Sequence, residues 1–184
     1  IYAGGSYLVS PVTTTCAPSL GSWNNISMVR SGSTVTIYFN GTSISSSSIS
    51  GSFSNTDKLA IGTLLALTTT RNFNGYISNF RVVKGTAVYT SSYTPSTTPL
   101  TAISNTSVLT CQSNRFIDNS SNAFALTVGG TPSVQRFSPF NPTAAYTAAT
   151  IGGSSYMEGF SQNSDLSTPS SSNLSLGAGD FTIE

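Results

Sequence analysis

Residues 23–41 read WNNISMVRSGSTVTIYFNG, and this stretch decides the fold. From position 33 to 39, small polar and large apolar side chains alternate with the period of a β-strand, so Val35, Ile37 and Phe39 share one face. The pair Asn40-Gly41 follows at once, and it predicts a tight hairpin turn because both residue types tolerate positive φ. Residues 23–30 predict an earlier strand, with Ser31-Gly32 as the turn between the two.

Short segments of the same kind recur along the chain, and no amphipathic helix longer than two turns is predicted. A second hairpin-type turn is expected at Asn74-Gly75. In the strand after it, the irregular spacing of Ile77, Phe80 and Val82 predicts a β-bulge. Further strands are expected at 58–63, 76–84, 108–111, 123–128, 134–140, 155–160 and 180–184.

The amino-acid composition also favours β-strands. Hydrophobic residues make up 38% of the 184 residues and charged residues only 7%, whereas charged residues form about 25% of a typical soluble domain. Ser and Thr together make up about a third of the chain. Disorder requires low hydrophobicity with high charge, whereas Thr, Val, Ile, Tyr and Phe suit a pleated, half-buried surface. We therefore expect an all-β fold.

The charge distribution argues against two classes of partner. Seven basic and six acidic residues give a net charge of +1, and no window holds a basic cluster that would neutralise a row of phosphates. The apolar runs are far shorter than the ~20 residues that a membrane helix needs. We expect neither nucleic-acid binding nor membrane insertion.

Cys16 and Cys111 are the only cysteines, and the chain has no histidine. Two cysteines do not make a metal site by themselves. Two interpretations stay open: a disulfide between them, or two small buried hydrophobic side chains.

Several blocks resemble the concanavalin A-like (laminin-G-type) jelly-roll domains that occur in marine phage, including cyanophage-like, tail fibre and virion surface proteins and in bacterial surface proteins. The order Trp, strand, Arg-x-Gly turn, strand, Asn-Gly is similar to the central hairpin of that family, and NGYISNFRV at 74–82 is similar to its closing strand. The resemblance gives structural roles to Trp23, Arg30, Gly32, Asn40, Gly41, Asn74, Gly75 and Phe80.

The second part of the chain resembles the beginning of such a domain. LTCQSNRFIDNSSN at 109–122 is similar to the opening strand and its Asp-x-Ser-x-Asn turn, and STPSSSNLSLGAGDFTIE at 167–184 is similar to the early strand pair. The resemblance therefore implies an antiparallel jelly-roll β-sandwich in parts of two tandem domains: residues 1–100 as the C-terminal half of one, 90–107 as a linker, and 105–184 as the N-terminal half of the next. The two halves would complement one another, within the chain or between copies.

Catalysis is not expected. The absence of histidine removes the common nucleophilic triads. Glycosidases place two carboxylates on either side of the scissile bond, and of the six acidic residues only Asp180 and Glu184 are in phase on one strand. At a domain-opening strand, a structural role is ordinary for them.

Calcium is the one cofactor that the sequence suggests. Ca²⁺ takes six or more oxygen ligands, and the loop at 118–122 concentrates carboxylate and amide oxygens. Residues further along could add to it, so the candidate set is Asp118, Asn119, Asn122, Glu158 and Asp165. The competing interpretation of the loop is an Asx turn that caps its own backbone.

Trp23 has two interpretations as well. It could stack on a sugar ring, but its position at the start of a core hairpin favours a buried packing role.

The resemblance implies a non-enzymatic structural or adhesion component of a phage virion or tail fibre, with tandem repeats that contact a host surface or glycans. Two alternatives are a secreted or cell-surface calcium-dependent lectin-like adhesin, and a filament subunit assembled by half-domain complementation. The expected partners are neighbouring copies or flanking domains and host-surface glycans. The expected location is the virion surface or the extracellular space.

Overall fold

The computed structural model describes residues 2–3, 6–7, 17–19, 21–53, 58–63, 72–113, 115–135, 137–140, 153–157 and 164–184. Within these ranges the only helical turn is the short 3-10 helix η1 (Ser172–Leu174), and every other regular element is a strand. All strand pairs are antiparallel. The prediction of an all-β, antiparallel fold is confirmed. No helix in the described ranges is long and apolar enough to cross a membrane.

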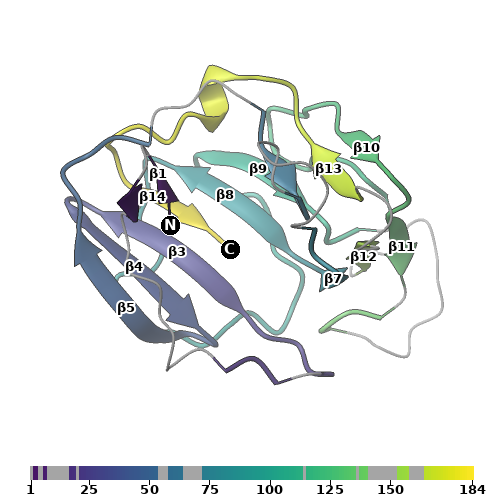
Figure 1. Cartoon of the computed structure of the whole chain (residues 1–184), viewed down its shortest axis with the longest axis horizontal. Helices are drawn as coiled ribbons and strands as arrows, with labels where there is room; N and C mark the ends of the chain where they lie inside the picture. The colour runs from purple at the N-terminus through teal and green to yellow at the C-terminus, as the bar shows by residue number, and fades with distance from the viewer. Residues whose placement is uncertain are drawn as a thin grey trace.

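The largest sheet joins six described strands in the order β5-β4-β3-β14-β8-β9 (Figure 1). Their bounds are β3 (Ile26–Ser31), β4 (Thr34–Phe39), β5 (Thr42–Ser48), β8 (Phe80–Lys84), β9 (Thr106–Thr110) and β14 (Phe181–Ile183). The hairpin predicted from residues 23–41 is present as β3 and β4, with Met28 opposite Ile37.

Smaller sheets form a second layer at the β8–β9 end of the large sheet, on the right in Figure 1. One contains β10 (Thr127–Gly129), β13 (Asp165–Ser167) and β6 (Ala60–Ile61), and another contains β11 (Ser133–Gln135), β12 (Ser154–Met157) and β7 (Gly75–Ile77). A two-stranded pair, β1 (Tyr2–Ala3) with β2 (Ser6–Tyr7), completes the described strands.

Buried apolar side chains form two clusters among the described residues. Ile61, Cys111, Met157 and Leu166 pack between the small sheets and Phe80 of β8. At the opposite end, Val35 and Ile49 are buried, with Met28, Ile37 and Phe53 against them. Cys111 is buried as a free thiol, while Cys16 lies outside the described residues.

The predicted single strand at 76–84 is wrong: the structure divides it at Asn79, whose φ of 58° is left-handed. The part before the break, β7, pairs with β12, and the part after it, β8, pairs with β14 and β9. Asn74-Gly75 is therefore not the tip of a hairpin, since Gly75 begins β7 and the partner of β7 is β12. The irregular spacing of Ile77 and Phe80 coincides with a change of sheet, and a register shift of the kind a bulge produces lies further along, between Val82 and Val83 in the pairing of β8 with β9.

The segment predicted as a linker, residues 90–107, is mostly exposed but is joined to the large sheet at specific points. Its last two residues, Thr106 and Ser107, belong to β9. Tyr93 donates its N–H to the carbonyl oxygen of Gly41 at 2.9 Å, and its hydroxyl donates to Asn25 Oδ1 at 2.7 Å. The segment is therefore fastened to the large sheet through Tyr93.

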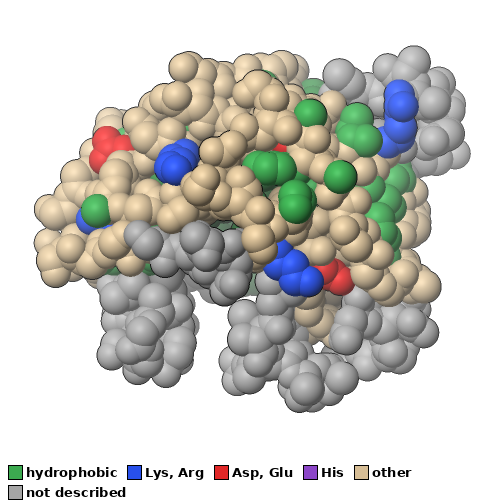
Figure 2. All heavy atoms as spheres, turned by 90° about the horizontal axis from the view of Figure 1, so that it is seen from above, with side chains coloured by type: hydrophobic (Ala, Val, Ile, Leu, Met, Phe, Trp, Pro, Cys, Tyr) green, Lys and Arg blue, Asp and Glu red, His purple; other side chains and the backbone are tan. Residues whose placement is uncertain are grey.

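Strands from both predicted half-domains share the large sheet. β14 lies between β3 and β8, which precede it by about 100 residues or more. The assignment of the two halves to separate repeats stays a prediction. On the face that Figure 2 shows, the few charged side chains are scattered among polar ones.

Candidate functional site: an exposed aromatic cluster

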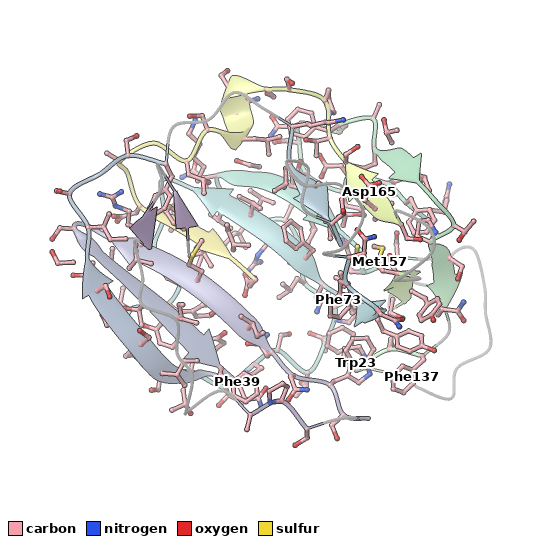
Figure 3. All side chains as sticks on the ribbon, in the orientation of Figure 1. Trp23, Phe39, Phe73, Phe137, Met157 and Asp165 are labelled. Atoms are coloured by element: carbon pink, nitrogen blue, oxygen red, sulfur yellow. The ribbon has the colours of Figure 1, made fainter. Side chains whose placement is uncertain are left out.

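Four aromatic rings meet beside the small sheet β11-β12-β7, and they come from all three of its strands or the residues next to them and from the segment before β3. Tyr76 of β7 and Tyr156 of β12 are directly opposite one another in the strand register, and their ring centroids lie 5.0 Å apart. Phe137, just after β11, lies edge-on to Tyr76 at 5.1 Å. Trp23, just before β3, stacks on Phe137 at 5.2 Å (Figure 3). We call these four residues the aromatic cluster.

The aromatic cluster is open to solvent. Tyr76 is 42% exposed and Phe137 is 41% exposed. Trp23 is half-buried and stands outside both buried clusters. Its indole Nε1 is buried without a hydrogen-bond partner. The packing role predicted for Trp23 is present in part, since its ring packs against Phe137 and Tyr76. The strand begins at Ile26, so the indole precedes the sheet and lies at its margin rather than in a buried cluster.

An apolar cavity lies beside the aromatic cluster. Phe73, which is 47% exposed, rests its ring against Gly75 at the start of β7. The same ring lines an open cavity of about 420 Å³, together with residues of β6, β7 and β8: Ala60, Ile61, Gly62, Thr63, Ile77 and Phe80. Exposed apolar surface of this kind marks sites of contact with ligands or other molecules.

The aromatic cluster offers both stacking and hydrogen bonding. Flat aromatic faces pack against apolar C–H surfaces, while a tyrosine hydroxyl presents a polar group at the rim. The hydroxyl of Tyr156 lies 3.5 Å from the amide oxygen of Asn74. This pairing of apolar faces with polar rims matches the surface of a sugar ring.

Asp118, the centre of the predicted calcium set, has both carboxylate oxygens engaged by the protein. Oδ1 accepts the N–H groups of Leu109 at 3.0 Å and of Ser120 at 2.9 Å. Oδ2 accepts the Ser120 hydroxyl at 2.8 Å and the Phe124 N–H at 3.0 Å. The bond to Ser120, two residues on, is the geometry of an Asx turn.

The Asp118 loop also closes an edge of the large sheet. Asn119 donates its N–H to the carbonyl oxygen of Leu109 at 2.7 Å, while Asp118 accepts the Leu109 N–H. Leu109 belongs to β9, the outer strand, whose free backbone groups would otherwise be open to pairing with another chain. The loop therefore has a structural role in this fold.

The other predicted calcium ligands have partners or positions of their own. Asn122 bonds to Asn173 and to the Ser107 carbonyl oxygen, Asn119 is exposed, and Glu158 lies outside the described residues. Asp165 is in β13, where partial burial raises the pKa of its carboxyl above the usual value, and nearby Lys58 offsets only part of that rise. Among the residues that the structure describes, no three His, Cys, Asp or Glu side chains come together to hold a metal. The calcium site stays a prediction.

Asp180 and Glu184, which are in phase on one strand, have separate partners. Asp180 Oδ1 accepts the N–H of Gly32 at 2.7 Å. Glu184 forms a buried ion pair with Arg81 and accepts the Tyr89 hydroxyl at 2.5 Å. Burial, with this hydrogen bond next, raises the pKa of Tyr89. Neither carboxylate faces an open site.

Arg30 bridges loops, as expected for an arginine at the end of a strand. Its guanidinium donates to the carbonyl oxygens of Gly32, Ile49 and Gly51 and lies over the ring of Phe53. Sequence reasoning missed the group formed by Arg81, Tyr89, Tyr93 and Glu184. The signal for it was the pair of tyrosines close to the predicted linker.

The comparisons concern the first half of the chain. Residues 1–88 match the family model of the concanavalin A-like lectin/glucanases superfamily, and the antiparallel sheets are consistent with its β-sandwich. No curated protein and no solved structure matches. Trp23 and Tyr76 lie inside the matched residues, while Phe137 and Tyr156 lie outside them, so the aromatic cluster draws on both parts of the chain.

Proposed function

We propose that the chain is a non-enzymatic adhesion module that contacts surface glycans through the aromatic cluster. The observation that carries the proposal is the stacking of Trp23 on Phe137, with Tyr76 edge-on to Phe137. Tyr76 and Phe137 are each more than two fifths exposed. The similarity of residues 1–88 to a superfamily whose description includes lectins supports it.

Neutral sugars suit this surface best. The chain carries little charge, with only 7% charged residues, and the aromatic cluster consists of uncharged side chains. The apolar face of a pyranose would lie on Phe137 or Tyr76, and its hydroxyls would meet the Asn74 amide and the Tyr156 hydroxyl. Single contacts of this kind are weak, but linked copies gain ~10²–10⁴ in overall affinity.

The setting we propose is a virion or tail fibre protein, at the virion surface or in the extracellular space, with neighbouring copies or flanking domains as partners. A hydroxyl-rich surface with scattered charge supports this setting. Tail or capsid genes beside the coding sequence would support a phage origin, and their absence from several independent genomic neighbourhoods would contradict it.

A glycan array followed by fluorescence titration tests the adhesion role. Trp23 is the single tryptophan, so its emission reports directly on the aromatic cluster. We expect neutral oligosaccharides to change that emission saturably, and Tyr76→Ala and Phe137→Ala to weaken binding at least ~10-fold, about 1.4 kcal/mol. The bound oligosaccharide is expected to be recovered uncleaved.

Ile103→Ala is the matched control, since Ile103 is a similarly exposed apolar residue, at 40%, that is not part of the aromatic cluster. It should leave affinity unchanged. Equal binding by wild type, Tyr76→Ala and Phe137→Ala would show that the aromatic cluster is not the contact surface. Repeating the titration with a chelator separates this proposal from a calcium-dependent lectin, because only the latter loses binding.

A further inference from the structure

The described strand β14 fills a slot between β3 and β8, and nearly every residue from Asp180 to Glu184 has its own partner there. In the sheet register, Phe181 is opposite Arg30 on one side and Lys84 on the other, and Ile183 is opposite Met28 and Val82. We propose that this slot is a strand-recognition site that also takes residues 180–184 of a second copy of this chain. The inference goes beyond glycan contact.

Asp180 is bound at the entry to the slot. Its carboxylate accepts the N–H of Gly32 at 2.7 Å, in the turn between β3 and β4. Its carbonyl oxygen accepts the N–H of Gly85 at 2.5 Å, just after β8. One residue is thus held by backbone donors from both walls of the slot, which fixes where the incoming strand begins.

Phe181 and Thr182 are bound in the middle of the slot. Phe181 is fully buried, with its ring edge-on to Phe53 at 5.4 Å. On the opposite face, the Thr182 hydroxyl accepts the N–H of Val88 at 2.9 Å and donates to the carbonyl oxygen of Thr86. A large apolar side chain followed by a hydroxyl is therefore selected by packing on one face and hydrogen bonding on the other.

Glu184 is bound at the far end of the slot. Arg81 and Tyr89 both bond to its carboxylate, and its backbone exchanges two hydrogen bonds with Arg81 at 2.6 and 2.9 Å. The side chains of Arg81 and Glu184 are only 6% and 3% exposed. A buried charge needs its partner, so the slot discriminates strongly against a strand that lacks the carboxylate.

None of these contacts depends on which chain supplies the strand. Residues 168–180 connect β13 to β14 through η1, and this connection is held to the rest of the chain by a bridge from Gly177 to Phe53 and by hydrogen bonds at Thr168, Ser172 and Asn173. Exchange of an identical element between copies keeps every contact in the slot and is a low-cost route to dimers. At low protein concentration, the chain's own strand has the higher effective concentration at the slot. Exchange therefore requires a high protein concentration or a weaker fit of the chain's own strand.

Two charge variants provide the test. Arg81→Glu and Glu184→Arg each put like charges in the closed slot. In an exchanged pair made from one of each, both slots hold opposite charges. We expect each variant alone to run at the 19.1 kDa of one chain, and the mixture, refolded together, to run at twice that mass by light scattering. A mixture that stays at the mass of one chain overturns the proposal.

The double variant Arg81→Glu/Glu184→Arg is the matched control, because it restores a reversed pair within one chain and should stay monomeric. A second measurement leaves the ion pair intact and uses the register of Thr182 opposite Val83. Thr182→Cys and Val83→Cys chains, mixed at high concentration and oxidised, should form a disulfide-linked pair. If the chain with both cysteines closes its own disulfide but the mixed single variants form none, the slot takes only its own strand.

Discussion

The carbonyl oxygen of Gly41 accepts the backbone N–H of Tyr93 at 2.9 Å, which fastens the segment after β8 to the turn after β4. The approach is so close that a Cβ on Gly41 would overlap the Tyr93 carbonyl group. Gly41 also has a φ of 78°, in the left-handed region. The Asn-Gly turn therefore serves two purposes: it reverses the chain, and it leaves room for a distant segment to dock.

Gly41→Ala is expected to lower the free energy of unfolding by about 2–5 kcal/mol, since left-handed strain and steric overlap add. Gly32→Ala is the matched comparison, because Gly32 has a φ of 59° but no atom within 4 Å of the position that a Cβ would take. It should cost only about 1–2 kcal/mol. Urea unfolding measures both, and equal losses would show that the docking of Tyr93 does not depend on Gly41.

Glu184→Gln is expected to cost about 3–5 kcal/mol, because it leaves the buried Arg81 guanidinium without its counter-charge. Tyr89→Phe removes one hydrogen bond to the same carboxylate and should cost about 1 kcal/mol. The comparison of the two midpoints in urea separates the charge from the hydroxyl. A loss below that of Tyr89→Phe would contradict a tight ion pair.

Cys111 should make the fold sensitive to alkali. Burial raises the pKa of its thiol from 9.0 to about 11, so the folded chain holds this proton more tightly than the unfolded chain does. The contribution to stability is complete below pH 9 and is lost as the pH rises through about 11. Cys111→Ala should reduce the fall in the urea midpoint over that pH range. If the variant falls as steeply as the wild type, the fall comes from other groups, such as Tyr89. Alkylation of Cys111, located by mass spectrometry, should require unfolding.

Asp118→Ala is expected to cost about 3 kcal/mol, since it leaves the backbone donors of Leu109, Ser120 and Phe124 without their acceptor. Asp118→Asn keeps an acceptor at one of the two positions and should cost less. Calcium that binds this loop would have to displace those donors, so we expect added Ca²⁺ to leave the melting temperature of the wild type unchanged. A rise in the wild type that Asp118→Asn abolishes would assign calcium to this loop.

Local features of the fold were predictable from the sequence, and features made between distant segments were not. The β3–β4 hairpin followed from alternation and Ser31-Gly32, and the turn after β4 from Asn40-Gly41, since a turn and its strands are neighbours in sequence. The break at Asn79 was not foreseen, because the choice between β12 and β9 as partners depends on segments far along the chain. The strand β5 was missed because its serines carry no apolar alternation.

The candidate site was predictable only in part. Sugar stacking by Trp23 was considered, but the position of the indole at the head of a hairpin favoured a core role. The rings that join it, Phe137 and Tyr156, come from more than 100 positions away, and no local pattern links them to Trp23. The Asx-turn interpretation of Asp118 was accessible because its donors at Ser120 and Phe124 are close in sequence.

The placement of β14 has a mechanical consequence. A pull on Glu184 along the strand axis loads the hydrogen bonds to β3 and β8 in shear, so the two rows resist together instead of opening one bond at a time. Buried anchors at Phe181 and Glu184 would have to slide at the same moment. The six-stranded sheet would carry such a load through its interior rather than along a peelable edge.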